Sequence, residues 1–336
     1  MPRRAHTPLA GVAATLMLAL GVATAGAHAN DGPKVKVKVE NDLVYTKAGG
    51  TELKLDIAAP EGSDGPMPAV LVIHGGAWRA GNKRDVGTVL RELAGHGYVA
   101  VSPQYRFCPS ELFPAQVHDV KAAVRWMKAH AAERRIDPER IGAMGFSAGG
   151  HLALMLGVTG AKDGLEGEAP PNSPDTRIRA VVNYFGPVDL DAPDIPEISK
   201  PLVKDFLGAL ATDRPELAAK ASPRTYVSRD DAAILTFQGT KDPLVPHTQA
   251  VILANAMTAA GVPGRVELMV GSGHGWGGAE MDHTRAETFA FLDRYLKTPG
   301  DKGKGKLKRA GAGAAAKASA VPAPAATADG KPAAKR

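Results

Sequence analysis

Three residue types that together can activate a hydroxyl occur in this chain in the order serine, aspartate, histidine. The serine is Ser147, within Gly145-Phe146-Ser147-Ala148-Gly149, which matches the pattern G-x-S-x-G. In this pattern the serine occupies a sharp turn between a strand and a helix, and the turn forces its φ toward positive values. The glycines are needed because the crowded backbone leaves no space for a Cβ. A hydroxyl presented on such a turn is suited to nucleophilic attack once a base removes its proton.

The base and the acid that orients it are expected after two later strands. Asp242 follows the apolar run that ends at Phe237, and His274 follows the run that ends at Val270. The chain order serine, acid, histidine is the one found where the serine occupies a G-x-S-x-G turn between a strand and a helix of a mostly parallel sheet. We therefore predict that His274 takes the proton of Ser147 and that Asp242 orients the imidazole. Because the base must be neutral, activity should fall on acidification.

Other residues compete for these two roles. His283, at the start of the last predicted helix, is the second candidate for the base, and Asp189 and Asp191 are the reserve acids. His151 lies four residues past the serine on the same predicted helix, so we expect a structural role for it.

Backbone N–H groups suited to stabilising negative charge are predicted beside His74-Gly75-Gly76. Acyl transfer builds negative charge on a carbonyl oxygen, and fixed donors must meet that oxygen. The amides of Gly75, Gly76 and Ala148 are the predicted donors of this oxyanion hole, and His74 is expected to brace the loop.

Two tryptophans and one cysteine near these loops need an assignment. Trp78 and Trp276 each flank a predicted catalytic loop, so they are candidate substrate contacts, with plain packing as the alternative. Cys108, the single cysteine, has no motif around it and is expected to act as a small buried hydrophobe. Gly273 to Gly278 fits G-x-G-x-x-G, but the further strand that a dinucleotide site requires does not follow. Metal-binding spacings such as H-E-x-x-H are absent from the sequence, so no metal or cofactor is predicted.

Strands and helices alternate along the body of the chain, and this alternation predicts how the residues meet. A hairpin is expected first, from the period-two patterns of 35–39 and 53–57 on either side of Gly49-Gly50. The continuous apolar run at 68–73 is typical of a strand covered on both faces of a sheet, and further strands are expected at 98–102, 141–144, 180–185, 233–237 and 265–270. Helices are expected at 86–96, 114–134, 151–156, 248–260 and 281–297. The pattern favours an α/β fold with a mostly parallel sheet, an N-terminal antiparallel hairpin and helices on both faces.

Two segments interrupt this alternation. Residues 160–176 are rich in Gly, Pro and acidic residues, which predicts a surface loop. Residues 189–231 contain several prolines and one helical stretch at 198–210. We interpret 189–231 as a small lid insertion over the site, with a plain surface insertion as the alternative.

The N-terminal segment, 1–29, has the features of a secretory signal peptide. Arg3 and Arg4 precede an apolar run from Leu9 to Val22, and Ala27-His28-Ala29 is a small-x-small cleavage site. An uncleaved membrane anchor is the alternative interpretation. We therefore expect a secreted or periplasmic protein whose catalytic domain occupies 30–298.

The C-terminal segment, 299–336, is basic and rich in Ala, Lys and Pro. It holds nine Lys or Arg against two Asp, so the formal charge of +6 for the whole chain leaves no positive excess on the rest. Such a segment cannot bury enough apolar surface to fold, and a solvated tail is expected. Contact of this tail with an anionic surface is the sharper interpretation. A nucleic-acid partner is not indicated, and the pattern does not indicate an oligomeric state.

With these residues assigned, 36–298 resembles the α/β-hydrolase superfamily, and within it the secreted carboxylesterases and the bifunctional acetylxylan–feruloyl esterases. Besides the motifs above, the resemblance is carried by Tyr105-Arg106, Ile136-Asp137-Pro138-Glu139-Arg140-Ile141 and Tyr184-Phe185-Gly186-Pro187. The hormone-sensitive-lipase branch usually has a third glycine where Ala77 stands and an acid where Phe146 stands, so the chain departs from that branch.

The resemblance implies a serine esterase that works through an acyl-enzyme on a small-molecule or polysaccharide-linked ester, with short-chain acyl, acetyl or feruloyl groups. It does not fix the acyl group or the alcohol. Kynurenine-formamidase-like enzymes share the H-G-G-x-W pattern and prolyl-oligopeptidase-like peptidases share the residue order, so a serine amidase or peptidase is the alternative. A binding protein on a hydrolase fold is the non-enzymatic alternative.

Overall fold

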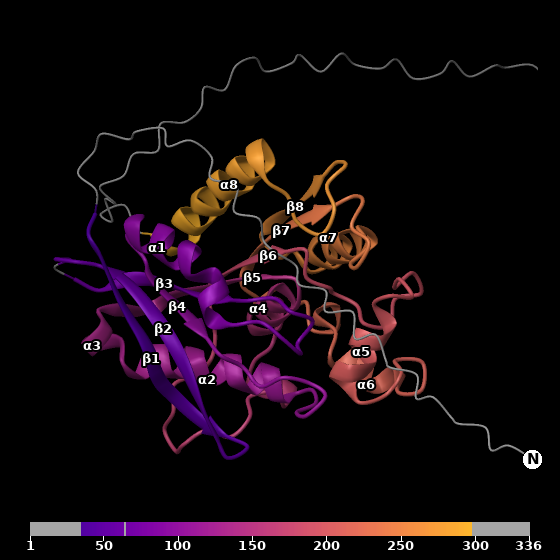
Figure 1. The fold of residues 1–336 in the computed structure, drawn as a ribbon, viewed down its shortest axis with the longest axis horizontal. Coiled ribbons are helices and arrows are strands. Elements are labelled where there is room, and N and C mark those ends of the chain that lie inside the picture. The colour runs from indigo at the N-terminus through magenta and orange to yellow at the C-terminus, as the bar shows by residue number, and fades with distance from the viewer. Residues whose placement is uncertain (1–34, 64, 298–336) are drawn as a thin grey trace, which may run out of the picture. The chain divides into compact units, whose positions relative to one another are not determined.

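An eight-stranded sheet organises the part of the protein that the structure describes. The computed structural model describes residues 35–63 and 65–297, and the predicted signal peptide (1–29) and basic tail (299–336) lie outside them. The spatial order is β1-β2-β4-β3-β5-β6-β7-β8 (Figure 1). The strands are β1 (Val37–Ala48), β2 (Thr51–Pro60), β3 (Met67–Ile73), β4 (Val99–Pro103), β5 (Ile136–Phe146), β6 (Ala180–Tyr184), β7 (Ala233–Gly239) and β8 (Gly264–Met269). The pairs β1–β2 and β2–β4 are antiparallel, and all the other neighbouring pairs in this order are parallel. This mostly parallel sheet with an N-terminal hairpin confirms the predicted fold class.

The N-terminal hairpin confirms the predicted turn but not the predicted strand lengths. Gly49 and Gly50 form a two-residue connection with φ of 56° and 79°, a conformation that glycine adopts without strain. The first strand reaches Ala48, well past the predicted end at 39, and its pairing shifts register between Glu40 and Leu43. This bulge breaks the alternation of apolar and polar residues that sequence analysis depends on.

Helices cover both faces of the sheet. They are α1 (Gly87–Gly95), α2 (Ala115–Ala129), α3 (Ala131–Arg134), α4 (Ala148–Val158), α5 (Lys200–Leu207), α6 (Pro215–Lys220), α7 (Thr248–Ala260) and α8 (Gly278–Leu296). The helices α1 and α8 lie on one face, and α2, α4 and α7 lie on the other (Figure 1). Their apolar residues form the two core clusters on these faces. The predicted helix at 114–134 is divided into α2 and α3 at His130, and α8 begins at Gly278 rather than at 281.

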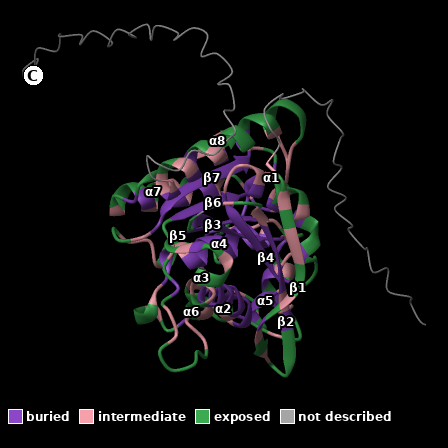
Figure 2. Cartoon of the chain, turned by 90° about the vertical axis from the view of Figure 1, so that its left-hand side faces the viewer, coloured by how far each residue is buried: buried purple, intermediate pink, exposed green. Residues whose placement is uncertain are grey.

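The middle of the sheet is inaccessible to water. Every residue of β3, β6 and β7 is buried, and so are ten of the eleven residues of α4, whereas the outward sides of α7 and α8 are exposed (Figure 2). Strands covered on both faces explain the continuous apolar runs in the sequence. This burial makes the carboxyl ends of β5, β6 and β7 rigid supports for the loops that follow them. No helix within the described residues is long and apolar enough to cross a bilayer.

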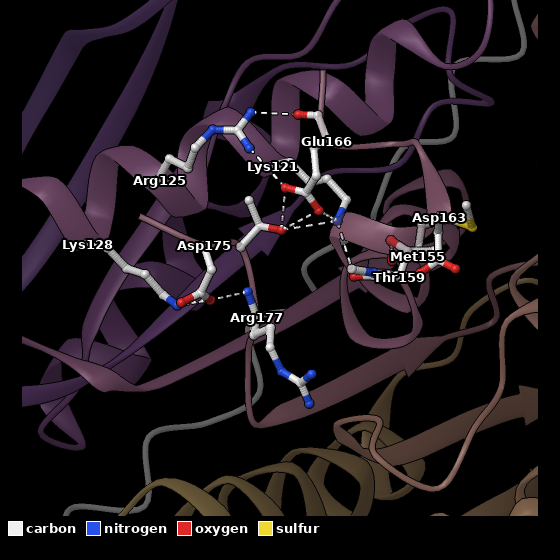
Figure 3. Close-up of polar contacts among 11 residues, drawn as sticks. Lys121, Arg125, Lys128, Met155, Thr159, Asp163, Glu166, Asp175 and Arg177 are labelled. Atoms are coloured by element: carbon white, nitrogen blue, oxygen red, sulfur yellow. Dashed lines mark hydrogen bonds and ion pairs between the residues drawn. The ribbon is translucent and has the colours of Figure 1, made fainter. Parts of the chain in front are cut away.

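The predicted surface loop, 160–176, is anchored by a buried charged cluster. Glu166 accepts hydrogen bonds from Lys121 at 2.7 Å and from Arg125 at 3.0 Å, both on α2 (Figure 3). Lys121 also donates to the Thr159 carbonyl and to the Thr176 hydroxyl. The Lys121 side chain is completely buried, so the cluster ties this loop to the body of the protein.

The insertion at 189–231 contains α5, α6 and the short 3-10 helix η3 (Pro223–Thr225). Phe206 of α5 is fully buried, and its carbonyl accepts the N–H of Phe113 at 2.9 Å. The insertion is therefore packed on the body through its own apolar residues. The role of a lid stays a prediction.

Candidate active site

The turn at Ser147 has the strained geometry predicted from the sequence. Ser147 joins β5 directly to α4 with a φ of 54° and ψ of −121°. Its N–H donates to the Tyr184 carbonyl at 2.8 Å, which fixes the turn to the end of β6. A Cβ on Gly145 would overlap the carbonyl of Gly149, and one on Gly149 would overlap the carbonyl of Ile73. The close approach of β5, α4 and β3 therefore requires both glycines of the motif.

Ser147, His274 and Asp242 form one hydrogen-bonded chain. Nε2 of His274 lies 2.9 Å from Oγ of Ser147, and Nδ1 of the same ring lies 2.7 Å from Oδ2 of Asp242. A carboxylate can only accept, so Nδ1 carries the proton and the lone pair of Nε2 faces the serine hydroxyl. This arrangement can move the hydroxyl proton to the imidazole and stabilise the resulting cation beside the carboxylate.

The Asp242 carboxylate is fully engaged. Oδ1 accepts the N–H groups of Leu244 and Val245 at 2.8 and 2.9 Å, and Oδ2 also accepts Nε2 of Gln238 at 3.0 Å. These bonds fix the oxygen that faces His274. Gln238 was not identified from the sequence, although it precedes the acid by only four residues on β7.

The loop that carries His274 rests on the loop that carries Asp242. Lys241 donates its N–H to the carbonyl of Ser272 at 2.9 Å. A Cβ on Gly239 would overlap the carbonyl of Gly273, so the close contact between the loops depends on that glycine. The two loops therefore position the imidazole and the carboxylate together.

The competing residues lie in other contacts. His283 is exposed and bonds Glu267 at 2.9 Å, within α8 rather than at its start. Asp189 forms an ion pair with Arg224, and Asp191 is exposed. None of the three contacts Ser147 or His274, so the geometry favours the first assignment over the alternatives.

The loop with the predicted oxyanion donors lies against the serine turn. A Cβ on Gly75 would lie 2.9 Å from the Phe146 carbonyl oxygen and 3.4 Å from Cβ of Ser147. Within the described part of the chain, the N–H groups of Gly75, Gly76 and Ala148 take part in no hydrogen bond. They are therefore free to meet an oxyanion beside Ser147.

His74 braces this loop from inside the protein. It is 1% exposed, its ring stacks on Tyr105 with centroids 4.5 Å apart, and Nδ1 lies 2.8 Å from the Gly75 carbonyl. Burial lowers the pKa of His74, which keeps the ring neutral. A carbonyl can only accept, so Nδ1 carries the proton of this ring.

Trp78 does not line an accessible cleft, so the expectation that it contacts substrate is wrong. Its side chain is 4% exposed, stacks on Phe206 at 4.3 Å, and donates Nε1–H to Nδ1 of His151 at 3.1 Å. Ala77 and Trp78 have φ of 52° and 57°, and this pair of left-handed residues turns the indole into the core. Packing, the alternative interpretation, explains Trp78.

His151 has the structural position expected for it. It is fully buried, and Nε2–H donates to the Ala221 carbonyl at 2.8 Å while Nδ1 accepts from Trp78. Burial lowers the pKa of His151 to about 4. The neutral ring therefore connects α4, the loop after β3 and the insertion.

Trp276 is half-buried beside the reactive groups. Its ring lies edge-on to Phe185 at 5.4 Å, and Phe185 in turn lies 4.7 Å from the ring of His274. Phe185 has a φ of 44°, another strained residue at the site that the sequence did not reveal. Trp276 thus remains a candidate substrate contact.

Cys108 is buried, as expected from the sequence. Burial raises the pKa of its thiol to about 11, which disfavours the reactive thiolate. Its sulfur lies 3.9 Å from the Ala77 carbonyl, so it packs beneath the loop rather than taking part in the hydrogen-bonded chain.

The sequence of the whole central region matches a known family. The model of the BD-FAE family matches residues 55–257, which is more than half of the chain. The chain belongs to the BD-FAE family. The predicted membership of an α/β-hydrolase esterase family is thereby confirmed.

The relatives of this BD-FAE protein include esterases. It is 33% identical to esterase LipC of Mycobacterium tuberculosis over 219 residues, which are 63% of this chain and 53% of LipC. The chain spans about half the length of the curated relatives it matches.

Solved structures of similar fold also include esterases. A truncated carbohydrate esterase from gut microbiota is 28% identical, with a TM-score of 0.68 over 78% of this chain and 99% of that one. Esterase Est2 of Thermogutta terrifontis, in its propionate-bound form, is 26% identical, with a TM-score of 0.62 over 78% of this chain and 93% of that one.

Proposed function

We propose that this protein is a serine esterase that hydrolyses carboxylic esters through a covalent acyl-enzyme. The observation that carries the proposal is the hydrogen-bonded chain from Ser147 through His274 to Asp242, at 2.9 and 2.7 Å. The esterases among its relatives support the same reaction class.

In the first half of the reaction, Oγ of Ser147 forms a bond to the ester carbonyl carbon while its proton passes to Nε2 of His274. The carbonyl oxygen becomes an oxyanion that accepts the N–H groups of Gly75, Gly76 and Ala148. The tetrahedral intermediate then collapses, the bond to the alcohol oxygen breaks, and the alcohol leaves with the proton from Nε2. Ser147 retains the acyl group.

In the second half, a water molecule gives its proton to Nε2 of His274 as its oxygen attacks the acyl carbon. The bond between that carbon and Oγ breaks, the carboxylic acid leaves, and the serine recovers its proton. Asp242 stabilises the imidazolium in both halves and is not itself protonated.

The substrates that we propose carry short acyl groups or are sugars esterified with acetyl or feruloyl groups. A carbohydrate esterase and a propionate-bound esterase among the structural relatives support this class. Phe185 and Trp276, beside His274, are the aromatic surface that we propose for the substrate.

The test compares the wild-type protein with Ser147→Ala on p-nitrophenyl esters of increasing chain length, acetylated xylan, a feruloyl ester and peptide amides. Ser147→Ala should lower kcat by on the order of 10⁶-fold and abolish labelling by a fluorophosphonate probe. Ser102→Ala is the control, because that hydroxyl is buried without a partner on β4 and should be dispensable. Esterase activity retained in Ser147→Ala, or turnover of peptides without turnover of esters, would reject the proposal.

A further inference from the structure

The Tyr105 hydroxyl contacts the backbone on the side opposite to the proposed oxyanion. Tyr105 is 2% exposed, and its Oη lies 3.1 Å from the carbonyl oxygen of His74 and 3.2 Å from that of Gly75. A phenol has one proton, so the two carbonyls share it in a three-centre hydrogen bond. Burial raises the pKa of Tyr105 well above its usual value, so the hydroxyl keeps this proton in the neutral range.

Each of these carbonyls belongs to the same peptide unit as one proposed oxyanion donor. The His74 carbonyl shares a peptide plane with the N–H of Gly75, and the Gly75 carbonyl shares one with the N–H of Gly76. Both peptide bonds are trans, so each N–H points away from its own carbonyl. Holding the two carbonyls toward Tyr105 therefore aims both N–H groups away from it, on the side where Gly75 lies against Ser147.

The Gly75 carbonyl oxygen is enclosed by His74 and Gly81 as well as by Tyr105. Nδ1 of His74 donates to the same oxygen at 2.8 Å. Gly81, with a φ of 108°, packs so closely that a Cβ there would lie 2.6 Å from this oxygen. Since both donors polarise the peptide unit, its N–H becomes a stronger donor as well as a better oriented one.

Tyr105 is itself held in place by its neighbour. Arg106 donates its N–H to Asp119 at 2.8 Å and its Nε to the same carboxylate at 2.9 Å, and Asp119 is buried on α2. The ring of Tyr105 is fixed between His74 and Phe107, with Phe107 edge-on at 5.4 Å. The hydroxyl is therefore a donor held in a fixed position against the loop that contains His74 and Gly75.

We infer that Tyr105 is a positioning residue for the oxyanion hole, because its hydroxyl orients the Gly75 and Gly76 N–H groups through their adjoining carbonyls. The inference rests on the proposed esterase function. Tyr105 does not touch the substrate, so its loss should weaken binding of the tetrahedral intermediate and leave binding of the ground-state ester unchanged.

The test is Tyr105→Phe, which keeps the ring stacked on His74 and deletes only the hydroxyl. Per active site, counted by titration, kcat should fall roughly 10-fold with KM within about twofold. Affinity for a trifluoromethyl ketone, which forms a tetrahedral oxyanion with the serine, should fall by the same factor. His74→Phe removes the other donor to the Gly75 carbonyl. In this variant kcat and inhibitor affinity should again fall by equal factors.

Tyr98→Phe is the matched control, since Tyr98 is an equally buried tyrosine whose hydroxyl donates to Asp293 at 2.6 Å, away from the loop. It should leave kcat per active site unchanged. Wild-type kcat and inhibitor affinity in Tyr105→Phe, or an equal loss in Tyr98→Phe, would overturn the inference while Ser147-dependent turnover stands. A wild-type protein without ester turnover would instead remove the proposed function itself.

Discussion

Trp78 and His151 are joined by a hydrogen bond of 3.1 Å from the indole N–H to Nδ1 of the imidazole. The bond links the loop that carries Gly75 and Gly76 to α4, whose first residue is Ala148. The predicted oxyanion donors come from these two elements, so the bond helps to hold the donors in one arrangement.

Acidification should destabilise the protein through His151. Its folded-state pKa of about 4 lies below the value of about 6.5 in an unfolded chain, so the unfolded state binds more protons between these values. Stability is complete above about pH 6.5 and is lost as the pH falls toward 4. Between pH 7 and pH 5 the loss from this one residue should be about 2 kcal/mol. Urea unfolding of wild type and His151→Gln at both pH values measures it, and equal losses in the two proteins would contradict the assignment.

Asp242→Asn should lower kcat by on the order of 10⁴-fold without unfolding the protein, because an amide can donate to Nδ1 of His274 and favour the wrong tautomer. Steady-state kinetics with p-nitrophenyl acetate measures the effect. Asp189→Asn, which alters the reserve acid, is the control and should keep the wild-type kcat. A larger loss in Asp189→Asn than in Asp242→Asn would reverse the assignment.

Phe206→Ala tests whether the insertion supports catalysis. Phe206 is fully buried and stacks on Trp78, so its loss should cost about 3–5 kcal/mol of stability and also lower kcat per active site by loosening the loop. Phe291→Ala, on α8 at the opposite face, removes a comparably buried ring and should lower stability alone. Equal effects of the two variants on kcat would show that the loss is not specific to the insertion.

Gly149→Ala should abolish the folded site, because the added Cβ would overlap the backbone of Ile73 and His74. Gly95→Ala is the matched control, since a Cβ at that position in α1 meets open space and alanine favours helix. Soluble yield and thermal unfolding distinguish them. A Gly149→Ala protein with wild-type melting temperature would refute the close contact of α4 with β3.

Glu166→Gln should cost about 3–5 kcal/mol, because it leaves the buried ammonium of Lys121 and the guanidinium of Arg125 without their shared carboxylate (Figure 3). Glu197→Gln, which alters an exposed pair with Lys200, should change stability by less than about 1 kcal/mol. Denaturant unfolding at neutral pH compares them, and a neutral effect of Glu166→Gln would mean that the loop is held by its other contacts.

The parts of the fold that the sequence predicted are those with a periodic signal. The buried middle strands are continuous apolar runs; Ser147 directly follows β5, and Asp242 and His274 follow within a few residues of the ends of β7 and β8. The order of the strands therefore predicts that Ser147, Asp242 and His274 lie at the same edge of the sheet. The length of β1 was not predictable in the same way, since a bulge near Asp42 removes the alternation.

The contacts that support the site left no comparable signal. Trp78 faces the core because Ala77 and Trp78 both have positive φ, and residue type does not indicate that conformation for a side chain with a Cβ. The Tyr105 hydroxyl bonds the carbonyl of Gly75, thirty residues earlier in the chain. Gln238 differs from an ordinary buried polar residue only because its amide donates to Asp242. Such contacts depend on the assembled fold and not on spacing along the chain.

Two of the contacts between the insertion and the catalytic body differ in kind: the ring of Phe206 stacks on Trp78, and the carbonyl of Ala221 accepts a hydrogen bond from His151. An engineer who exchanges this segment for that of another hydrolase, to change the range of accepted esters, has to transplant both contacts with it. A replacement segment of the right length that lacks either contact would loosen the support of Trp78 or His151. It would therefore disturb the catalytic residues in addition to changing which esters are accepted.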